Sequence, residues 1–186
     1  MSWGPSHAMP HSSILERCQF GETSAWHLVF EQYVHSVYRW ALCFGIDPAG
    51  AEELTQEVFA TAMKSIGRCP SEALLPAWLF QITRRLAANL RRSVWFSRVL
   101  KAGGAREVES PSGTGPGISG DMHAHELSLD LRRALYKMPA KLVEVLVLAD
   151  LEGYARDEIA RLLGIPEGTV ASRLHKARAM IEQELG

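Results

Sequence analysis

The sequence has few cysteines, and none of them are paired at a spacing typical of metal ligands. Cys18, Cys43 and Cys69 are the only three in 186 residues, and they lie far apart in the chain. Zinc frameworks and disulfide scaffolds need clustered or paired cysteines. We therefore expect no metal site, no disulfide set and no cofactor.

Long apolar runs are also missing. No run reaches the ~18 consecutive apolar residues that a membrane span requires, and residues 1–13 lack both the basic start and the apolar centre of a signal peptide. We expect a cytoplasmic protein with no direct membrane insertion. Residues 1–14 are expected to form a disordered tail.

The chain carries little net charge. Its formal net charge is −1 and its pI is about 6.7, which argues against a protein that coats nucleic acid by bulk electrostatics. The sequence also lacks a phosphate-binding glycine loop and a nucleophile elbow. We therefore predict no catalytic residues and no enzyme activity, and any DNA binding must come from local patches.

The segment 153–185 has the pattern of a helix-turn-helix. Ile159, Leu162 and Leu163 give one apolar stripe, and Gly164 follows where a helix end favours a positive φ. A second helix is predicted from around Pro166. An ordinary helical hairpin would show the same alternation. The polar and cationic row on the outer face favours a helix that lies in the major groove of DNA, with Thr169, Ser172, Arg173 and Lys176 on that row.

The N-terminal half predicts three amphipathic helices. Apolar residues recur at steps of three or four over residues 24–44, over 49–66, and in a long helix that begins near Pro76. Asp47 and Pro48 are expected to cap and open the second of these helices. Its polar face carries Glu53, Gln56 and Glu57, which would be a solvated face if nothing binds there.

Residues 103–120 are rich in Gly, Ser, Pro and Thr and show no apolar periodicity, as is typical of a flexible linker. The expected fold is therefore all-α, with two small helical domains joined by that linker. We place the domains at residues 15–101 and 125–186, the linker at 102–124 and the tail at 1–14.

With both halves placed, the chain resembles the extracytoplasmic-function (ECF) group of bacterial RNA polymerase sigma factors, within the sigma-70 family. Three strings carry the resemblance: AEELTQEVFATAMKSI at 51–66, PAWLFQITRRLAANLRR at 76–92 and EIARLLGIPEGTVASRLHKAR at 158–178. Their order and separation make it specific. By this resemblance the first domain is sigma region 2 and the second is sigma region 4.

The resemblance implies an alternative sigma factor that binds core RNA polymerase and opens promoter DNA. The face of Glu53, Gln56 and Glu57 would dock on the clamp of the largest subunit, and the flap would be a second polymerase contact. The −10 element would be read by Arg68, Arg84, Arg85, Asn89, Arg91 and Arg92. The −35 element would be read by Thr169, Ser172, Arg173, His175, Lys176 and Arg178. An anti-sigma factor is a further expected partner.

Three positions depart from the family pattern. Ala155 stands where a Ser or Thr commonly caps the first helix of the motif, and losing such a cap typically costs ~1 kcal/mol. Ala171 replaces a common Lys or Arg, and Arg85 replaces a common Asn. The −35 and −10 sequences that this chain prefers are therefore open to measurement.

Two other functional classes remain alternatives. One is a stand-alone helix-turn-helix regulator whose N-terminal domain senses a signal. It would bind DNA tightly without polymerase and in a salt-dependent way. The other is a metal sensor or metalloenzyme that uses the three cysteines with His27 or His35. Irregular ligand spacing disfavours it.

Overall fold

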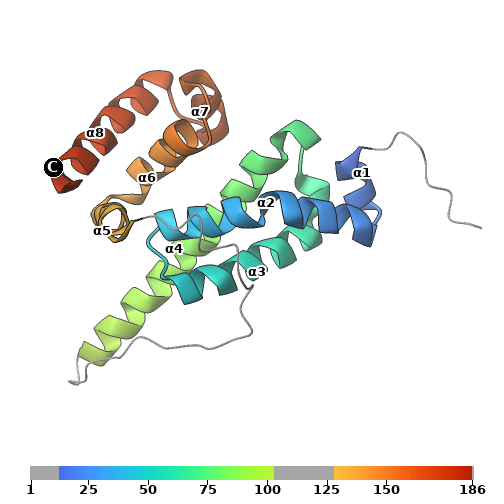
Figure 1. The fold of residues 1–186 in the computed structure, drawn as a ribbon, viewed down its shortest axis with the longest axis horizontal. Coiled ribbons are helices and arrows are strands. Elements are labelled where there is room, and N and C mark those ends of the chain that lie inside the picture. The colour runs from blue at the N-terminus through green and yellow to red at the C-terminus, as the bar shows by residue number, and fades with distance from the viewer. Residues whose placement is uncertain (1–12, 103–127, 186) are drawn as a thin grey trace, which may run out of the picture.

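The computed structural model describes residues 13–102 and 128–185, and the regular structure in these two ranges is entirely helical (Figure 1). The N-terminal unit comprises α1 (Ile14–Gln19), α2 (Thr23–Cys43), α3 (Pro48–Ser65), two 3₁₀ turns, η1 (Ile66–Arg68) and η2 (Glu72–Leu74), and α4 (Leu75–Ala102). The C-terminal unit comprises α5 (Leu129–Lys137), α6 (Ala140–Leu146), the π-helical turn η4 (Val147–Leu151), α7 (Arg156–Leu163) and α8 (Glu167–Leu185). The all-α prediction is confirmed. Nearly all of the expected linker lies outside the described residues.

Side-chain caps fix the starts of two helices in the N-terminal unit. The Asp47 carboxylate accepts a hydrogen bond from the Gly50 amide at 2.8 Å, and Pro48 occupies the first helical position of α3, as the sequence predicts. At α1, Ser13 and Glu16 form a reciprocal capping box. Ser13 and Ile14 were expected in the disordered tail, but this box places them at the start of a helix.

The other boundaries differ from the sequence prediction by one or two residues. Most of the loop expected at 67–75 is folded into η1 and η2, and α4 begins at Leu75 rather than Pro76. Ala102, expected to open the linker, is the last residue of α4. Short 3₁₀ turns show no apolar periodicity, so a prediction from composition assigns their residues to a loop.

Aromatic side chains fill the centre of the N-terminal unit. The rings of Trp40 and Phe80 meet edge to face, with centroids 5.3 Å apart, and the centroid of the Phe44 ring lies 5.7 Å from that of Phe80. Phe30 and Phe59 join α2 to α3 with centroids 4.8 Å apart. The aromatic side chains of α2 therefore join α2, α3 and α4 to one another.

The C-terminal unit buries the apolar faces that the helix-turn-helix pattern predicts. Ile159 of α7 and Val170 and Ala177 of α8 are fully buried, and Leu174 is nearly so. The backbone of Gly164, with φ +63°, ends α7 in the left-handed conformation. This turn sets the angle at which α8 follows α7.

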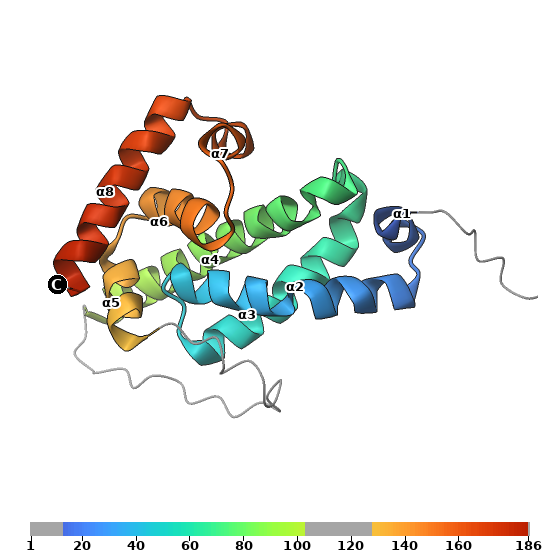
Figure 2. The same ribbon diagram turned by 45° about the horizontal axis from the view of Figure 1, so that its top comes forward.

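The two units pack against each other (Figures 1 and 2). Helices α5 and α6 lie beside α2 and α4, and the buried apolar residues of both units form one continuous cluster. Gly45, with φ +79°, lies against Tyr136 of α5: a Cβ at this position would come within 2.9 Å of the Tyr136 ring. Among the described residues, no helix is long and apolar enough to cross a membrane.

Candidate functional site

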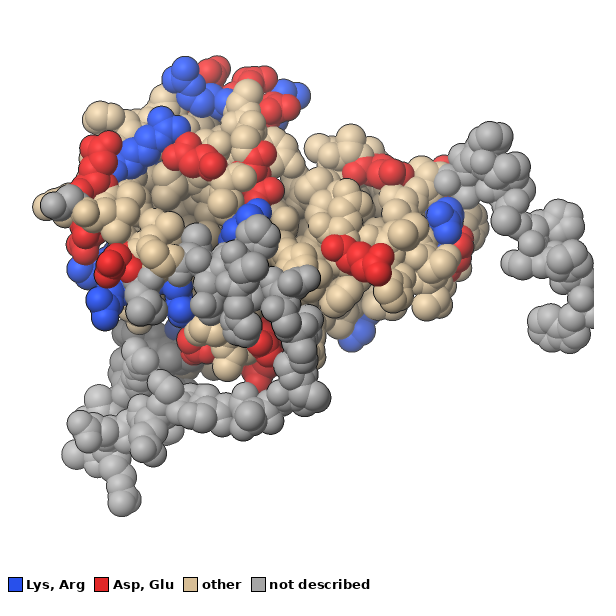
Figure 3. Space-filling model, in the orientation of Figure 1, with Lys and Arg blue, Asp and Glu red and all other residues tan. Residues whose placement is uncertain are grey.

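The outer face of α8 presents the polar and cationic row expected to contact DNA. Ser172, His175 and Lys176 are exposed, while Thr169 and Arg173 are partly buried at its edges. The Ser172 hydroxyl donates to the Thr169 carbonyl at 3.1 Å, one turn back along the helix. Figure 3 shows basic and acidic side chains side by side over the α7 and α8 end of the molecule. This face can meet DNA through a few local contacts rather than a broad positive field.

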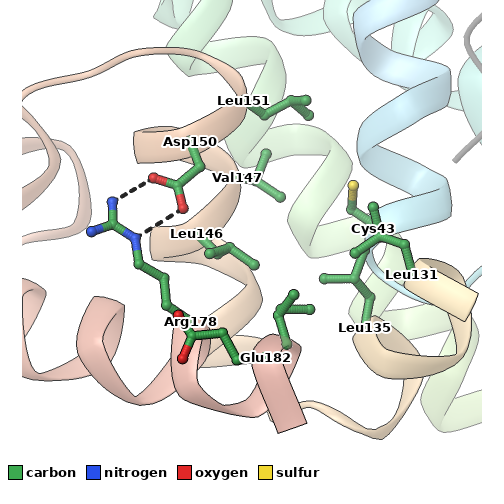
Figure 4. Close-up of a pocket in the computed structure, with 10 residues that line it drawn as sticks. Cys43, Leu131, Leu135, Leu146, Val147, Asp150, Leu151, Arg178 and Glu182 are labelled. Atoms are coloured by element: carbon green, nitrogen blue, oxygen red, sulfur yellow. Dashed lines mark hydrogen bonds and ion pairs between the residues drawn. The ribbon is translucent and has the colours of Figure 1, made fainter. Parts of the chain in front are cut away.

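Arg178 is engaged differently from the rest of the row. Its guanidinium donates to both carboxylate oxygens of Asp150, at 2.6 and 3.1 Å, and so ties α8 to η4 (Figure 4). These hydrogen bonds raise the pKa of Arg178. Of the −35 candidates, Arg178 is therefore the one that the structure places in an ion pair within the C-terminal unit.

The first helix of the motif begins without the usual cap. Ala155 has no side-chain acceptor, but the Glu158 carboxylate accepts a hydrogen bond from the Ala155 amide at 2.8 Å. Only half of a capping box is present. Glu158 and Asp157 also place negative charge in the first turn of α7, where the helix dipole favours it.

Glu53, Gln56 and Glu57 form the exposed face of α3. The buried face of the same helix carries Leu54, Val58 and Ala62. The exposed ridge continues through Ala60 to Met63, whose side chain is 55% exposed. An acidic start and an apolar end on one free helix face are suited to a protein partner.

The five arginines and Asn89 that are expected at the −10 element fall into two groups. Arg68, Arg85, Asn89 and Arg92 are exposed. Arg84 and Arg91 are partly buried by contacts with other elements: Arg84 pairs with Glu144 of α6 at 3.1 Å. Arg91 donates to the Phe44 carbonyl at 3.2 Å and lies over the Tyr136 ring of α5, 5.6 Å from its centroid. The structure thus leaves only part of this set free to meet a ligand.

Two acidic residues of the C-terminal unit that the sequence analysis did not single out face the N-terminal unit. Glu144 is 7% exposed. Glu152, directly after η4, accepts a hydrogen bond from the Trp40 indole at 2.8 Å and pairs with Arg39 at 3.4 Å. The one sequence signal for Glu144 is that it interrupts the apolar run of α6.

The described residues hold no group of three side chains that could bind a metal ion. Cys18, Cys43 and Cys69 are each buried and unpaired with one another. Burial raises the pKa of all three thiols, that of Cys43 to about 12. A protonated, buried thiol is a poor metal ligand and a poor nucleophile.

Two family models match the chain, one in each unit. The family described as Sigma-70 region 2 matches residues 29–96, and Sigma-70, region 4 matches residues 128–181. The first match spans most of α2 to α4. The second spans α5 to most of α8, including the helix-turn-helix.

Relatives and solved structures agree with these matches. The chain is 26% identical to the RNA polymerase sigma-H factor of Pseudomonas aeruginosa over 92% of both chains, and 25% identical to the ECF RNA polymerase sigma-E factor of Escherichia coli over 97% of this chain and 96% of that one. It is 29% identical to the ECF RNA polymerase sigma factor SigE of Mycolicibacterium smegmatis over 87% of its length, but spans only 62% of that relative.

Two solved structures share the fold. CnrH, in complex with the cytosolic domain of CnrY, matches with a TM-score of 0.65 and 20% identity over 92% of this chain and 94% of that one. The sigma factor RpoE of Bartonella quintana, in complex with the anti-sigma factor NepR, matches with a TM-score of 0.64 and 23% identity over 86% of this chain and 95% of that one. With both family regions present in order on one chain, this protein belongs to the extracytoplasmic-function sigma factors of the sigma-70 family.

Proposed function

We propose that this alternative sigma factor acts in the cytoplasm by binding core RNA polymerase, contacting promoter DNA at the −10 and −35 elements and promoting DNA opening. The observation that carries the proposal is the free outer face of α8. Ser172, His175 and Lys176 project from a helix that Gly164 turns away from α7. In helix-turn-helix proteins that row contacts base edges and phosphates in the major groove.

The exposed face of α3 is proposed to dock on the clamp of the largest polymerase subunit. The side chains of Glu53, Gln56 and Glu57 make no hydrogen bond or ion pair within the described residues. Their side chains can therefore bind a basic partner without breaking an existing contact. The polymerase flap is proposed as the second contact, on the C-terminal unit.

The −10 element is proposed to bind along α4 and the turn η1 before it. Arg85, Asn89 and Arg92 lie within two turns of α4, and Arg68 lies in η1. Holding an unstacked base takes phosphate contacts and a stacking surface to offset a cost of a few kcal/mol. The exposed arginines supply the phosphate contacts.

An anti-sigma factor is also proposed as a partner. CnrH and the Bartonella RpoE share this fold, and the RpoE structure contains an anti-sigma factor. Such a partner would act by covering the α3 face, the α8 face or both. No catalysis is proposed for the chain, because sigma factors are initiation factors rather than enzymes.

The test is transcription with purified core polymerase on promoter libraries from the source genome. We expect the protein to raise initiation at a subset of promoters. The double variant Glu53→Lys/Glu57→Lys should lose core binding and initiation while keeping its melting temperature, because both side chains are exposed.

Glu31→Lys is the matched control. Glu31 is an exposed acid on α2 whose ion pair with His27 is confined to that helix, so the substitution reverses a surface charge away from α3. If adding the wild-type protein to core polymerase raised initiation at none of the promoters, the proposal would be refuted. Tight DNA binding without polymerase, together with that result, would favour a stand-alone regulator.

A further inference from the structure

The C-terminal unit forms an apolar pocket together with Cys43 of α2 (Figure 4). The pocket has a volume of about 330 Å³, which lies within the ~300–1,000 Å³ that small-molecule sites occupy. Its apolar wall comes from α5, the end of α6, the turn η4 and α8, through Leu131, Leu135, Leu146, Leu151 and Ile181. All of these except Leu135 stay partly exposed, so a ligand that covered them would remove apolar surface from water.

The turn η4 forms one wall of this pocket. Val147, Asp150 and Leu151 belong to η4 and line the pocket. Within residues 13–102 and 128–185, η4 is the one π-helical turn, and it follows α6 directly. A π-helical turn is rare, and such turns occur frequently at functional sites. The irregular turn of the C-terminal unit therefore coincides with its pocket.

Three charged side chains line the pocket beside the apolar wall: Asp150 of η4 and Arg178 and Glu182 of α8 (Figure 4). Arg178 donates to both carboxylate oxygens of Asp150, so these two charges compensate each other. Glu182 lies one turn further along α8 and is exposed, and its side chain makes no hydrogen bond or ion pair within the described residues. The pocket therefore carries one negative charge in excess.

We propose that this pocket binds a small organic cation, a primary amine with an apolar body. The ammonium group pairs with the Glu182 carboxylate, and the apolar body covers the partly exposed leucines. A neutral apolar molecule would leave Glu182 unpaired. A carboxylate ligand would be repelled by Glu182 and Asp150, and the Arg178 guanidinium that could attract it is already held by Asp150.

The pocket lies mainly on the unit that matches Sigma-70, region 4. Asp150, which holds Arg178 of α8, is one of its lining residues. A bound amine would therefore act next to the contact that orients α8. An effect on promoter use rests on the proposed function, whereas binding of the amine requires neither polymerase nor promoter DNA.

The first test is isothermal titration calorimetry of the full chain with three ligands of equal chain length: octylamine, octanol and octanoate. We expect octylamine to saturate at one molecule per chain and to bind about fivefold more tightly than octanol, the most that an exposed ion pair commonly contributes. Octanoate should bind most weakly. Absence of saturable octylamine binding would overturn the proposal. Equal affinity for octylamine and octanol, or tighter binding of octanoate, would overturn it as well.

Charge reversal at Glu182 tests the role of its carboxylate. Glu182→Lys gives the pocket one positive charge in excess, so octanoate should now bind more tightly than octylamine. Glu184→Lys is the matched control: Glu184 is an exposed acid of α8 that pairs with Lys137 and does not line the pocket. This control should keep the order of the wild-type protein. An unchanged order in Glu182→Lys, or an inverted order in Glu184→Lys, would contradict the proposal.

Filling the pocket tests where the apolar body lies. Leu146→Trp places a larger side chain in the apolar wall and should abolish octylamine binding. Unchanged affinity in a folded Leu146→Trp variant would show that octylamine binds elsewhere and would overturn the proposal. If circular dichroism shows that this variant does not fold, the charge-reversal pair decides, because Glu182 and Glu184 are exposed and their substitution leaves the buried residues intact.

Discussion

Arg178 and Asp150 form a two-pronged ion pair that links α8 to the π-helical turn η4. Both side chains are substantially exposed, and both line a pocket that the C-terminal unit forms together with Cys43 of α2 (Figure 4). Because two nitrogens of this guanidinium donate to the two oxygens of the Asp150 carboxylate, we expect Arg178 to orient α8 rather than to contact DNA.

Arg178→Ala is therefore expected to act on the C-terminal unit rather than on promoter contacts. Because exposed ion pairs contribute little, the melting temperature should fall by no more than about 2–4 °C. Asp150→Asn should lower it equally. The deciding measurement is the salt dependence of promoter binding by the polymerase complex. A phosphate contact would reduce the slope of log K against log salt by about 0.9, whereas we expect no change.

Arg173 is predicted to behave in the opposite way. It lies on the outer side of α8, partly buried, and its side chain makes no hydrogen bond or ion pair within the described residues. Arg173→Ala should weaken use of −35-dependent promoters about tenfold or more, since a good base contact is worth ~1–3 kcal/mol. Affinity for core polymerase should persist through the N-terminal unit. Gel-shift and in vitro transcription assays measure the two effects separately.

Arg133→Ala is the matched control for Arg173→Ala. Arg133 is an exposed arginine of α5 that pairs with Asp130 one turn away, and its loss should leave promoter use unchanged. If Arg173→Ala abolished binding to core polymerase itself, the division of labour between the two units would be wrong.

The helices and their buried faces could be predicted because each carries its own local signal. The apolar steps of α2, α3 and α8, the Asp47 cap and the positive φ of Gly164 are all read within a few residues. The exposed polar rows on α3 and α8 could be predicted as well, because they lie on the helix faces opposite the buried apolar residues. The assignment of these rows to polymerase and promoter DNA came from the family resemblance and stays a prediction.

The interdomain contacts could not be predicted in this way. Arg39 and Glu152 are 113 residues apart, and nothing in the sequence near either residue identifies the other. Glu144 sits inside an apolar helix, where sequence reasoning sees only an interruption. The same limit applies to Arg84, Arg91 and Arg178: they read as free cations, yet each is held by a partner distant in the chain.

Restoring the missing cap of α7 should stabilise the C-terminal unit. Ala155 has the extended backbone of a cap residue, with φ −69° and ψ 156°, and Glu158 already supplies the return hydrogen bond. Ala155→Ser would complete the capping box and raise the free energy of unfolding by about 1 kcal/mol. Urea denaturation followed by circular dichroism measures the change. The control Ala179→Ser places the same residue on the exposed middle of α8, where it should be slightly destabilising.

Burial of Cys43 should make the protein less stable in alkali. The folded-state pKa of the thiol is raised from its usual 9.0 to about 12 by desolvation, so the folded protein keeps this proton while the unfolded chain releases it above about pH 9. Stability contributed by the neutral thiol is fully present below pH 9 and is lost as pH rises toward 12. The loss reaches at most ~1.4 kcal/mol per pH unit.

Cys43→Ala lacks this ionisation, so the stability advantage of the wild-type protein over the variant should shrink between pH 8 and pH 10.5. Urea titrations of both proteins at several pH values test it, and a constant difference would show that the Cys43 thiol ionises equally in the folded and unfolded states.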